Sequence, residues 1–254
     1  MNILITGFKG FLGHNLSQFL TKKNIKIFGL GRSKKDIKNK NFIKGNINKK
    51  NLYRFQKEFD FIIHCAGSGR INYSYKKDYS NNVVSTENIL KFIKNKPKTK
   101  LIFISSISVF GNHSKKIANF SKKKPLSTYS KNKLRAEKLC EFYSKKYKLD
   151  VLIFRIPSLY GIGLKKQLIY DACVKISKNK NVFFGSGNEL RDWIHINDIT
   201  RLIHMIIKKS FRRINYYNCS SKNQFTTKKI ISYISQKMNK TINPFFNYQK
   251  MNSN

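Results

Sequence analysis

The chain has 254 residues, 40% of them hydrophobic, and its 52 Lys and Arg residues against 12 Asp and Glu residues give a formal net charge of +40. This much apolar material predicts a folded core and excludes a chain that is disordered throughout. No apolar run reaches about 18 residues, and the N-terminus shows neither a basic region nor a cleavage site, so we expect no membrane span and no secretory signal. We therefore expect a cytoplasmic protein.

The positive charge has two interpretations. It could mark a surface that binds nucleic acid or an anionic membrane. However, 43 of the 52 basic residues are Lys, and they are scattered in pairs such as Lys22-Lys23. Scattered lysines are typical of an ordinary solvated surface, so we expect no specific nucleic-acid partner. The four cysteines form no CxxC motif, and no cluster of His, Cys and carboxylates is present, so we expect free thiols and no metal.

Apolar runs of strand length alternate with segments of helical periodicity over the first 160 residues. Helices are predicted at 11–22, 82–94 and 127–147. Strands are predicted at 1–6, 25–30, 42–47, 59–65, 100–105 and 150–155. The continuous apolar runs at 59–65 and 100–105 are typical of strands covered on both faces. This alternation predicts an α/β fold with a doubly wound parallel sheet of Rossmann type.

After residue 160 the pattern loosens. The elements predicted there are helices at 167–177, from about 197 and at 226–238, and strands at 182–184 and 216–219. We expect residues 1–160 to form an NAD(P)-binding domain of Rossmann type. Residues 161–254 should form a short substrate-binding lobe, from which 216–219 returns to the sheet.

A glycine-rich segment, GFKGFLG, follows the first predicted strand and places Gly7, Gly10 and Gly13 in a GxxGxxG spacing. Glycines permit a tight turn and let backbone N–H groups approach a pyrophosphate. The helix that begins near Phe11 and Leu12 adds the positive end of its dipole. Because the motif lies between a strand and a helix, it predicts a dinucleotide-binding turn.

Tyr129 and Lys133 indicate proton-transfer chemistry. They stand four residues apart in the helix predicted at 127–147 and therefore share one face of it. A free phenol has a pKa of about 10, and a neighbouring ammonium favours the phenolate. Tyr129 could then act as a general base or acid on a hydroxyl or carbonyl, while Ser106 hydrogen-bonds the same oxygen.

These motifs, taken in order, resemble the extended branch of the short-chain dehydrogenase/reductase superfamily, the NAD-dependent epimerase/dehydratase family of nucleotide-sugar epimerases and reductases. The resemblance runs from Met1 to about Met238. It rests on GFKGFLG at 7–13, FDFIIHCAG at 59–67, NVVSTEN at 82–88, SSISVFG at 105–111, YSKNK at 129–133, RIPSLYG at 155–161 and RDWIHIND at 191–198.

The resemblance implies a nicotinamide cofactor and a set of site residues. Ser106, Tyr129 and Lys133 would be catalytic, with Asn82 helping to organise the site. The further cofactor contacts that it implies, besides the glycine turn, Tyr129 and Lys133, are Asn46, Ile47, Cys65, Ala66, Gly67 and Pro157. Asn46 stands where the family often has an adenine-contacting Asp.

The choice between NAD(H) and NADP(H) depends on the end of the second predicted strand. An Asp there would bind the ribose hydroxyls of NAD. This chain has Arg32 and Ser33 instead, and both can donate to a 2′-phosphate. We therefore predict that NADP(H) is preferred, with NAD(H) left open. The competing interpretation of Arg32 is one more surface cation on a basic chain.

The positions at which the chain departs from the family pattern reduce the number of reactions that it is expected to catalyse. The family's 4,6-dehydratases carry acidic residues directly after the equivalent of Ser106, because elimination of water needs a further acid and base. Ile107 and Ser108 follow here, so we expect no dehydration. The chemistry left is hydride transfer at a ring carbon, C4, of a nucleotide-sugar, by 4-epimerisation or by 4-keto reduction. The resemblance places Ser158 and Arg191, along with Ser106, at the substrate.

A second hypothesis is a non-catalytic, cofactor-bound relative that binds RNA or a protein complex through its basic surface. The presence of Ser106, Tyr129 and Lys133 counts against it, since a binding module does not need all three. The resemblance also implies a homodimer formed through the helices predicted at 82–94 and 127–147.

Overall fold

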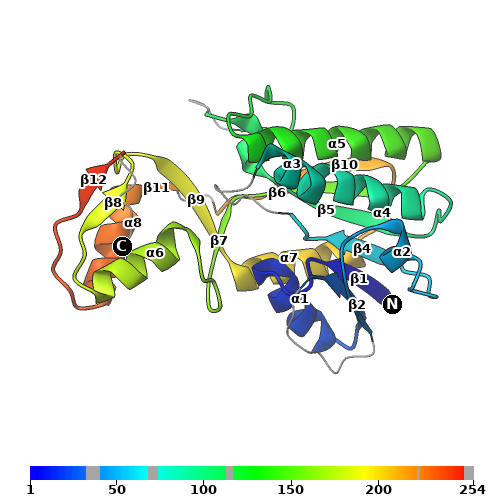
Figure 1. Ribbon diagram of the computed structural model, residues 1–254, viewed down its shortest axis with the longest axis horizontal. Coiled ribbons are helices and arrows are strands. Elements are labelled where there is room, and N and C mark those ends of the chain that lie inside the picture. The colour runs from blue at the N-terminus through cyan, green and yellow to red at the C-terminus, as the bar shows by residue number, and fades with distance from the viewer. Residues whose placement is uncertain (33–40, 68–73, 113–116, 222–223, 249–254) are drawn as a thin grey trace. The chain divides into compact units, whose positions relative to one another are not determined.

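The computed structural model describes residues 1–32, 41–67, 74–112, 117–221 and 224–248 (Figure 1). The chain separates into two compact units. The first unit comprises Met1–Pro157 and Asn197–Cys219, and the second comprises Ser158–Ile196 and Ser220–Asn254. Among the described residues, no helix combines the length and apolar character that a membrane crossing needs.

The first unit is built on a seven-stranded sheet in the order β10-β6-β5-β4-β1-β2-β3, in which every neighbouring pair is parallel. This order confirms the predicted doubly wound α/β fold. The strands are β1 (Asn2–Thr6), β2 (Lys26–Gly31), β3 (Phe42–Lys44), β4 (Phe61–His64), β5 (Lys100–Ser106), β6 (Val151–Ile156) and β10 (Ile214–Asn218).

Helices cover both faces of this sheet, with α4 and α5 on one face and α1 and α7 on the other (Figure 1). β4 and β6 are buried along their whole length, as strands between two helical layers must be. The helical segments are α1 (Phe11–Thr21), α2 (Lys49–Leu52), α3 (Tyr75–Tyr79), the π-helical turn η1 (Ser80–Val84), α4 (Ser85–Ile93), the 3₁₀ turn η2 (Ile107–Phe110), α5 (Thr128–Tyr147) and α7 (Ile196–Lys208).

The first unit takes up more of the later chain than the sequence predicts. Besides β10 it includes residues 197–208 of α7, whereas we expected only 216–219 to return to the sheet. The reason lies in the amphipathic pattern of α7. Its residues Ile199, Ile203, Ile206 and Ile207 are buried and recur at helical spacing, so the helix covers a sheet face.

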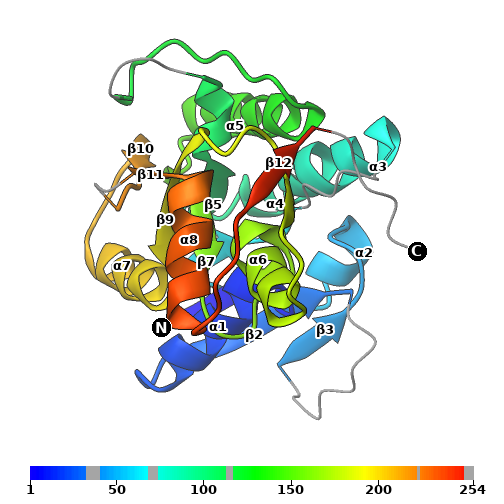
Figure 2. The ribbon, with the colours of Figure 1, turned by 90° about the vertical axis from the view of Figure 1, so that its left-hand side faces the viewer.

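The described residues of the second unit form two small sheets and two helices. Its strands and helices are β7 (Ser158–Tyr160), α6 (Gln167–Ser177), β8 (Val182–Phe184), β9 (Leu190–His195), β11 (Gln224–Thr226), α8 (Thr227–Lys237) and β12 (Phe245–Asn247). The sheets have the orders β11-β9-β7 and β12-β8. α6 and α8 lie side by side (Figure 2), and Ala172, Ile176, Phe183 and Ile231 form a core of their own.

Candidate active site

The glycine turn between β1 and α1 packs directly against the segment that follows β4. Gly7 has a φ of +66°, and a Cβ added to it would lie 2.8 Å from the Cα of Ala66. A Cβ on Gly13 would collide with the carbonyl oxygen of Gly7. Both positions therefore require glycine, because a larger residue would push the turn away from the sheet.

The start of α1 is suited to an anion. The helix begins at Phe11, directly after the exposed Gly10, and no side chain of the described residues caps it. Its first turn contains no acidic residue. The free N–H groups and the positive end of the helix dipole therefore remain available, so the turn fits a pyrophosphate. The side chain of Leu12 is buried, so Leu12 can contribute there through its backbone.

The segment after β4 meets two of the predicted site residues. A Cβ added to the exposed Gly67 would lie 2.8 Å from Oδ1 of Asn82 and 3.0 Å from Nζ of Lys133. Glycine at this position therefore lets the backbone run beside an amide and an ammonium. Burial raises the pKa of the neighbouring Cys65 to about 12, against the opposing charge of Lys133, so this thiol stays protonated at neutral pH.

Lys133 is buried, and its Nζ donates a hydrogen bond to the carbonyl oxygen of Ile104, 2.9 Å away. The same nitrogen lies 6.0 Å from the ring centre of Tyr129 and 4.8 Å from that of Phe103. Burial lowers the pKa of Lys133 to about 8, although nearby acidic groups raise it. Lys133 is therefore protonated at neutral pH and loses its proton more easily than an exposed lysine.

Tyr129 opens the first turn of α5, and a capping box between Ser127 and Ser130 fixes that helix end. Burial and the negative charge of Asp78 raise the pKa of Tyr129 to about 12, and a hydrogen bond with Ser106 lowers it. The Ser106 oxygen also accepts hydrogen bonds from the N–H and hydroxyl of Ser108, at 3.2 and 2.9 Å. The structure thus brings Tyr129, Lys133 and Ser106 together, and burial is the largest influence on the tyrosine.

Asn82 lies in the π-helical turn η1, where the amide N–H of Ser85 bonds the carbonyl of Ser80, five residues back. Such turns interrupt α-helices and are frequent at functional sites. The side-chain amide of Asn82 is buried and donates to the backbone oxygen of Asp78 at 3.0 Å and to its Oδ1 at 3.1 Å. The turn therefore directs Asn82 inward, toward Lys133 and Gly67.

His64 is buried at the end of β4, and the sequence does not predict it as a site residue. Its Nδ1 lies 2.7 Å from the hydroxyl of Thr6 and its Nε2 lies 3.0 Å from that of Thr86. Because the Thr86 hydroxyl donates to the carbonyl of Asn82, it accepts from Nε2 of His64. Burial keeps the pKa of His64 well below its usual value, so the ring is neutral, and it links β4 and β1 to Thr86 at the start of α4.

Sequence reasoning missed the buried ion pair between Glu137 and Arg155. Nε and one terminal nitrogen of Arg155 donate to the two Glu137 oxygens at 3.0 and 2.8 Å, and Ser105 donates to the same carboxylate at 2.6 Å. Both charged side chains are 0% exposed. Glu137 stands four residues after Lys133 on the same helix face, which is the one signal in the sequence that could have identified it. The pair ties α5 to β5 and β6.

The residues predicted near the adenosine lie at the ends of β2 and β3. Arg32 is exposed, and its guanidinium donates to Oδ1 of Asn81, 3.0 Å away. Nδ2 of Asn81 is buried and has no partner among the described residues. Asn46 is exposed, and Ile47 is partly buried, with its carbonyl bonded by Asn88. Ser33 lies outside the described residues.

The two residues predicted at the substrate belong to the second unit, whereas the buried Pro157 ends the first segment of the first unit. Ser158 begins β7 and is partly buried, opposite Trp193 of β9. Arg191 is exposed on β9. The adjacent Asp192 is buried and accepts hydrogen bonds from the backbone and hydroxyl of Ser221, so it forms no ion pair with Arg191 among the described residues.

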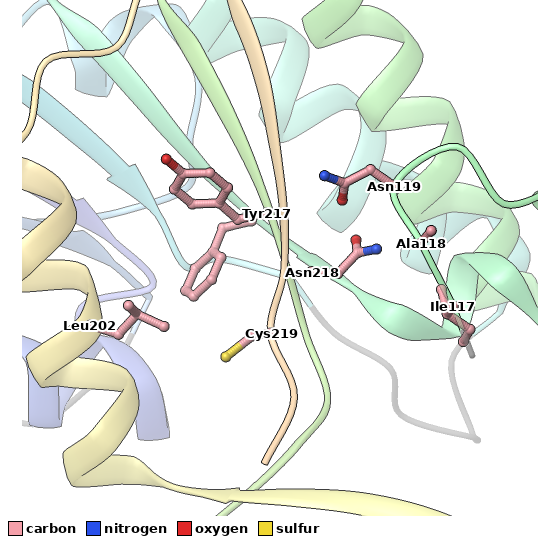
Figure 3. A pocket seen from close by; sticks show the side chains of 8 residues that line it. Ile117, Ala118, Asn119, Leu202, Tyr217, Asn218 and Cys219 are labelled. Atoms are coloured by element: carbon pink, nitrogen blue, oxygen red, sulfur yellow. The ribbon is translucent and has the colours of Figure 1, made fainter. Parts of the chain in front are cut away.

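A pocket of about 420 Å³ lies in the first unit at the edge strand β10 (Figure 3). It contains none of the predicted site residues. The amide of Asn119 lies there beside β10 and donates to the carbonyl of Tyr216 at 3.0 Å, which covers part of the open strand edge. The residues that line the pocket are Ile117, Ala118, Asn119, Phe154, Leu202, Tyr217, Asn218 and Cys219.

The fold and these motifs define a class of protein: residues 3–220 match the model of the NAD dependent epimerase/dehydratase family, and the chain belongs to that family. The resemblance found in the sequence is thereby confirmed. The chain is 32% identical over 241 residues to the dTDP-D-glucose 4,6-dehydratase of Dictyostelium discoideum, covering 82% of this chain and 55% of that protein.

Two further relatives are epimerases. The chain is 27% identical to the UDP-glucuronate 4-epimerase of Thermodesulfobacterium geofontis, over 78% of this chain and 69% of that one. The crystal structure of the UDP-glucuronic acid 4-epimerase of Bacillus cereus in complex with NAD superposes with a TM-score of 0.87 at 25% identity, covering 97% of this chain and 87% of that one.

Proposed function

We propose that the chain transfers a hydride to or from C4 of a nucleotide-activated sugar, as a 4-epimerase or a 4-keto reductase. The observation that carries this proposal is the group formed by Tyr129, Ser106 and Lys133. A phenol hydrogen-bonded to a serine hydroxyl lies one helical turn from a buried ammonium. Such a group can give a proton to a carbonyl oxygen or take one from a hydroxyl, which hydride transfer at that carbon requires.

The chain's own residues fit a dinucleotide along the carboxyl ends of the strands. The turn of Gly7, Gly10 and Gly13 and the N–H groups of Phe11 and Leu12 would hold the pyrophosphate. The remaining contacts that we propose are Asn46, Ile47, Cys65, Ala66, Gly67, Tyr129, Lys133 and Pro157. A nicotinamide bound there supplies or accepts the hydride.

In the direction of carbonyl reduction, Tyr129 starts with its proton in place. Because its pKa is raised to about 12, the phenol is protonated at neutral pH and can donate to the oxygen of a sugar carbonyl. The reverse reaction, oxidation of the hydroxyl, returns that proton to Tyr129 as phenolate. The ammonium of Lys133 favours the phenolate, and the Ser106 hydroxyl holds the sugar oxygen against the phenol. Asn82 helps to keep this group in place.

Similarity to the 4,6-dehydratase of Dictyostelium discoideum suggests dehydration as an alternative to epimerisation or reduction. We propose that this chain does not carry it out. The residues that follow Ser106 are Ile107 and Ser108, and the neighbour of the Ser106 oxygen is the Ser108 hydroxyl at 2.9 Å. The nearby carboxylate of Asp78 accepts hydrogen bonds from Asn82 and Asn132 and is not presented to a substrate. Elimination of water would therefore lack its additional acid and base.

For the cofactor we propose a preference for NADP(H), with NAD(H) as the competitor. Arg32 is exposed at the end of β2 and hydrogen-bonded to Asn81. The hydrogen bond restrains the guanidinium before the ligand arrives, which reduces the entropy lost on binding. Two terminal nitrogens and a fixed charge suit a phosphate better than they suit two ribose hydroxyls. Ser33 is proposed to assist.

For the sugar nucleotide we propose Arg191 as the ligand of the diphosphate and Ser158 as a further contact. Arg191 is exposed, and Asp192 beside it is occupied by Ser221 rather than by the guanidinium. Among the described residues the Arg191 guanidinium has no carboxylate partner, so its charge can bind an anion. The alternative of a non-catalytic RNA-binding or protein-binding relative has no support from the relatives above, which are named as enzymes.

A panel of UDP-, dTDP- and GDP-sugars and their 4-keto forms, each incubated with NAD(H) or NADP(H), tests the function. Products are separated chromatographically and assigned by NMR. We expect an inverted or reduced C4 centre, loss of product in Tyr129→Phe, and retained product in Tyr53→Phe, a matched change of an exposed tyrosine. A 4-keto-6-deoxy product from an unmodified hexose would instead establish a dehydratase. Equal turnover by the wild type and Tyr129→Phe would refute the proposed role of Tyr129.

A further inference from the structure

Asp78 is a buried carboxylate beside the proposed catalytic group that the proposed function does not use. It is 4% exposed. Among the described residues only two other carboxylates are buried: Glu137 pairs with Arg155, and Asp192 accepts hydrogen bonds from Ser221. Asp78 forms no ion pair with any described residue, in a chain that carries 52 basic residues. A buried charge that forms no ion pair is costly unless hydrogen bonds stabilise it, which calls for an explanation.

The two oxygens of Asp78 hold two side-chain amides. Oδ1 accepts from Nδ2 of Asn82 at 3.1 Å, and Oδ2 accepts from Nδ2 of Asn132 at 2.7 Å. Asn132 is fully buried, directly precedes Lys133, and is held on its other side by Arg135, which donates to its Oδ1 at 2.8 Å. One carboxylate therefore fastens the π-helical turn η1 to α5 between Tyr129 and Lys133.

A neutral group could not make the same contacts. Both partners present N–H groups, so the acceptor must offer two oxygens, and an amide at position 78 would offer one oxygen and turn a competing N–H toward the other. The link alone would be weakened by an Asn at this position, but not abolished, because Asn82 also bonds the backbone carbonyl of Asp78. The complete link therefore requires the carboxylate of Asp78.

We propose that Asp78 is a positioning residue: through Asn82 and Asn132 it fixes α5 against η1, and it places its negative charge within one helical turn of Tyr129, the group that gives its proton to the substrate. The second half rests on the proposed function, since it assigns the proton a use. The link between η1 and α5 and the effect of the Asp78 charge on Tyr129 do not depend on which reaction the protein catalyses.

The groups around Tyr129 act on its pKa in opposing directions: Asp78 raises it, whereas the hydrogen bond with Ser106 lowers it. Three groups act on Tyr129: the carboxylate of Asp78, which lies in α3, the hydroxyl of Ser106 at the end of β5, and the ammonium of Lys133, which shares α5 with Tyr129. Asp78 raises the pKa of Tyr129, after burial, and also raises that of Lys133. The other titratable groups that face Lys133 are Cys65, His64, Glu137 and Cys140. Loss of the Asp78 charge should therefore let Tyr129 ionise at lower pH.

The experiment follows the ionisation of Tyr129 in the full chain. Tyrosine is labelled with ¹³C at the carbon that bears the hydroxyl, and the resonance absent from Tyr129→Phe is assigned to Tyr129. It is titrated in the wild type, in Asp78→Asn and Asp78→Ser, and in Asp78→Glu, which keeps the charge. Glu141→Gln is the matched control, since it also removes a hydrogen-bonded carboxylate, one that binds Tyr216. The Ser variant avoids the N–H contacts that could unfold the Asn variant.

We expect Tyr129 to ionise about one pH unit lower in both neutral variants, the size of effect that a nearby charge exerts, and to be unmoved in Asp78→Glu and Glu141→Gln. Folded neutral variants whose Tyr129 titrates as in the wild type would overturn the electrostatic role. A lower titration in Glu141→Gln of equal size would do the same. The titration needs no substrate, so a chain that turns over no sugar nucleotide but shows the shift refutes the proposed function and leaves the effect of Asp78 on Tyr129 established.

Discussion

Glu137→Gln is expected to be among the most destabilising single changes of charge in the first unit. The wild-type carboxylate accepts two hydrogen bonds from Arg155 and one from Ser105, with both charged side chains 0% exposed. Breaking a buried pair on one side costs about 3–5 kcal/mol, because the remaining charge stays buried without its partner. We expect about 3 kcal/mol, the lower end, because the amide oxygen of Gln still accepts one guanidinium N–H.

The matched control is Glu87→Gln. Glu87 pairs with Lys91 at 2.7 Å, no longer than the 2.8 Å of the buried pair, but these side chains are 35% and 55% exposed. Exposed pairs of this kind contribute about 0.3–0.5 kcal/mol. Urea denaturation followed by circular dichroism measures both variants under the same conditions. Equal losses in the two variants would refute the reasoning, because the Glu137 carboxylate is buried and accepts three hydrogen bonds, whereas the Glu87 carboxylate is exposed and pairs with one lysine. The double change Glu137→Leu with Arg155→Met should recover most of the loss, because no unpaired charge remains.

Three further outcomes are expected. Tyr129→Phe should lower kcat by at least about 10²-fold at unchanged thermal stability, measured on whichever sugar nucleotide the wild type converts; a smaller loss would exclude Tyr129 as the proton donor. Arg32→Ala should weaken NADP(H) binding about ten- to a hundredfold in calorimetric titration and leave NAD(H) binding unchanged. Asn81→Ala should weaken NADP(H) binding less, and Arg54→Ala, a change of an exposed arginine, should not weaken it at all. Equal losses for both cofactors would make Arg32 a general surface cation. Because burial lowers the pKa of Lys133 to about 8, the folded chain loses that proton at lower pH than the unfolded chain does. The unfolding free energy of the wild type should therefore rise relative to that of Lys133→Met between about pH 8 and pH 10.5. Denaturation of both proteins at several pH values measures this, and a difference that stays constant with pH would contradict it.

Several features of this protein follow from the sequence alone because they depend on neighbours along the chain. The spacing of Gly7, Gly10 and Gly13 after an apolar run is enough to place a tight strand-to-helix turn, since backbone geometry is local. A separation of four residues is enough to put Tyr129 and Lys133 on one face of a helix. Unbroken apolar runs are enough to indicate strands buried on both faces, and with them the doubly wound sheet.

The tertiary structure decided the features that join distant parts of the chain. Asp78 meets Asn132 across 54 positions, and Arg32 meets Asn81 across 49. Nothing in a lysine-rich sequence distinguishes a buried Asp or Glu from a surface one, because burial is set by which elements pack together. The raised pKa of Tyr129 has the same origin: the spacing to Lys133 predicts a more acidic phenol, whereas burial, which depends on packing, outweighs it. Motifs were therefore predictable from local geometry, but the protonation of the candidate site was not, because desolvation exists only once the chain has folded.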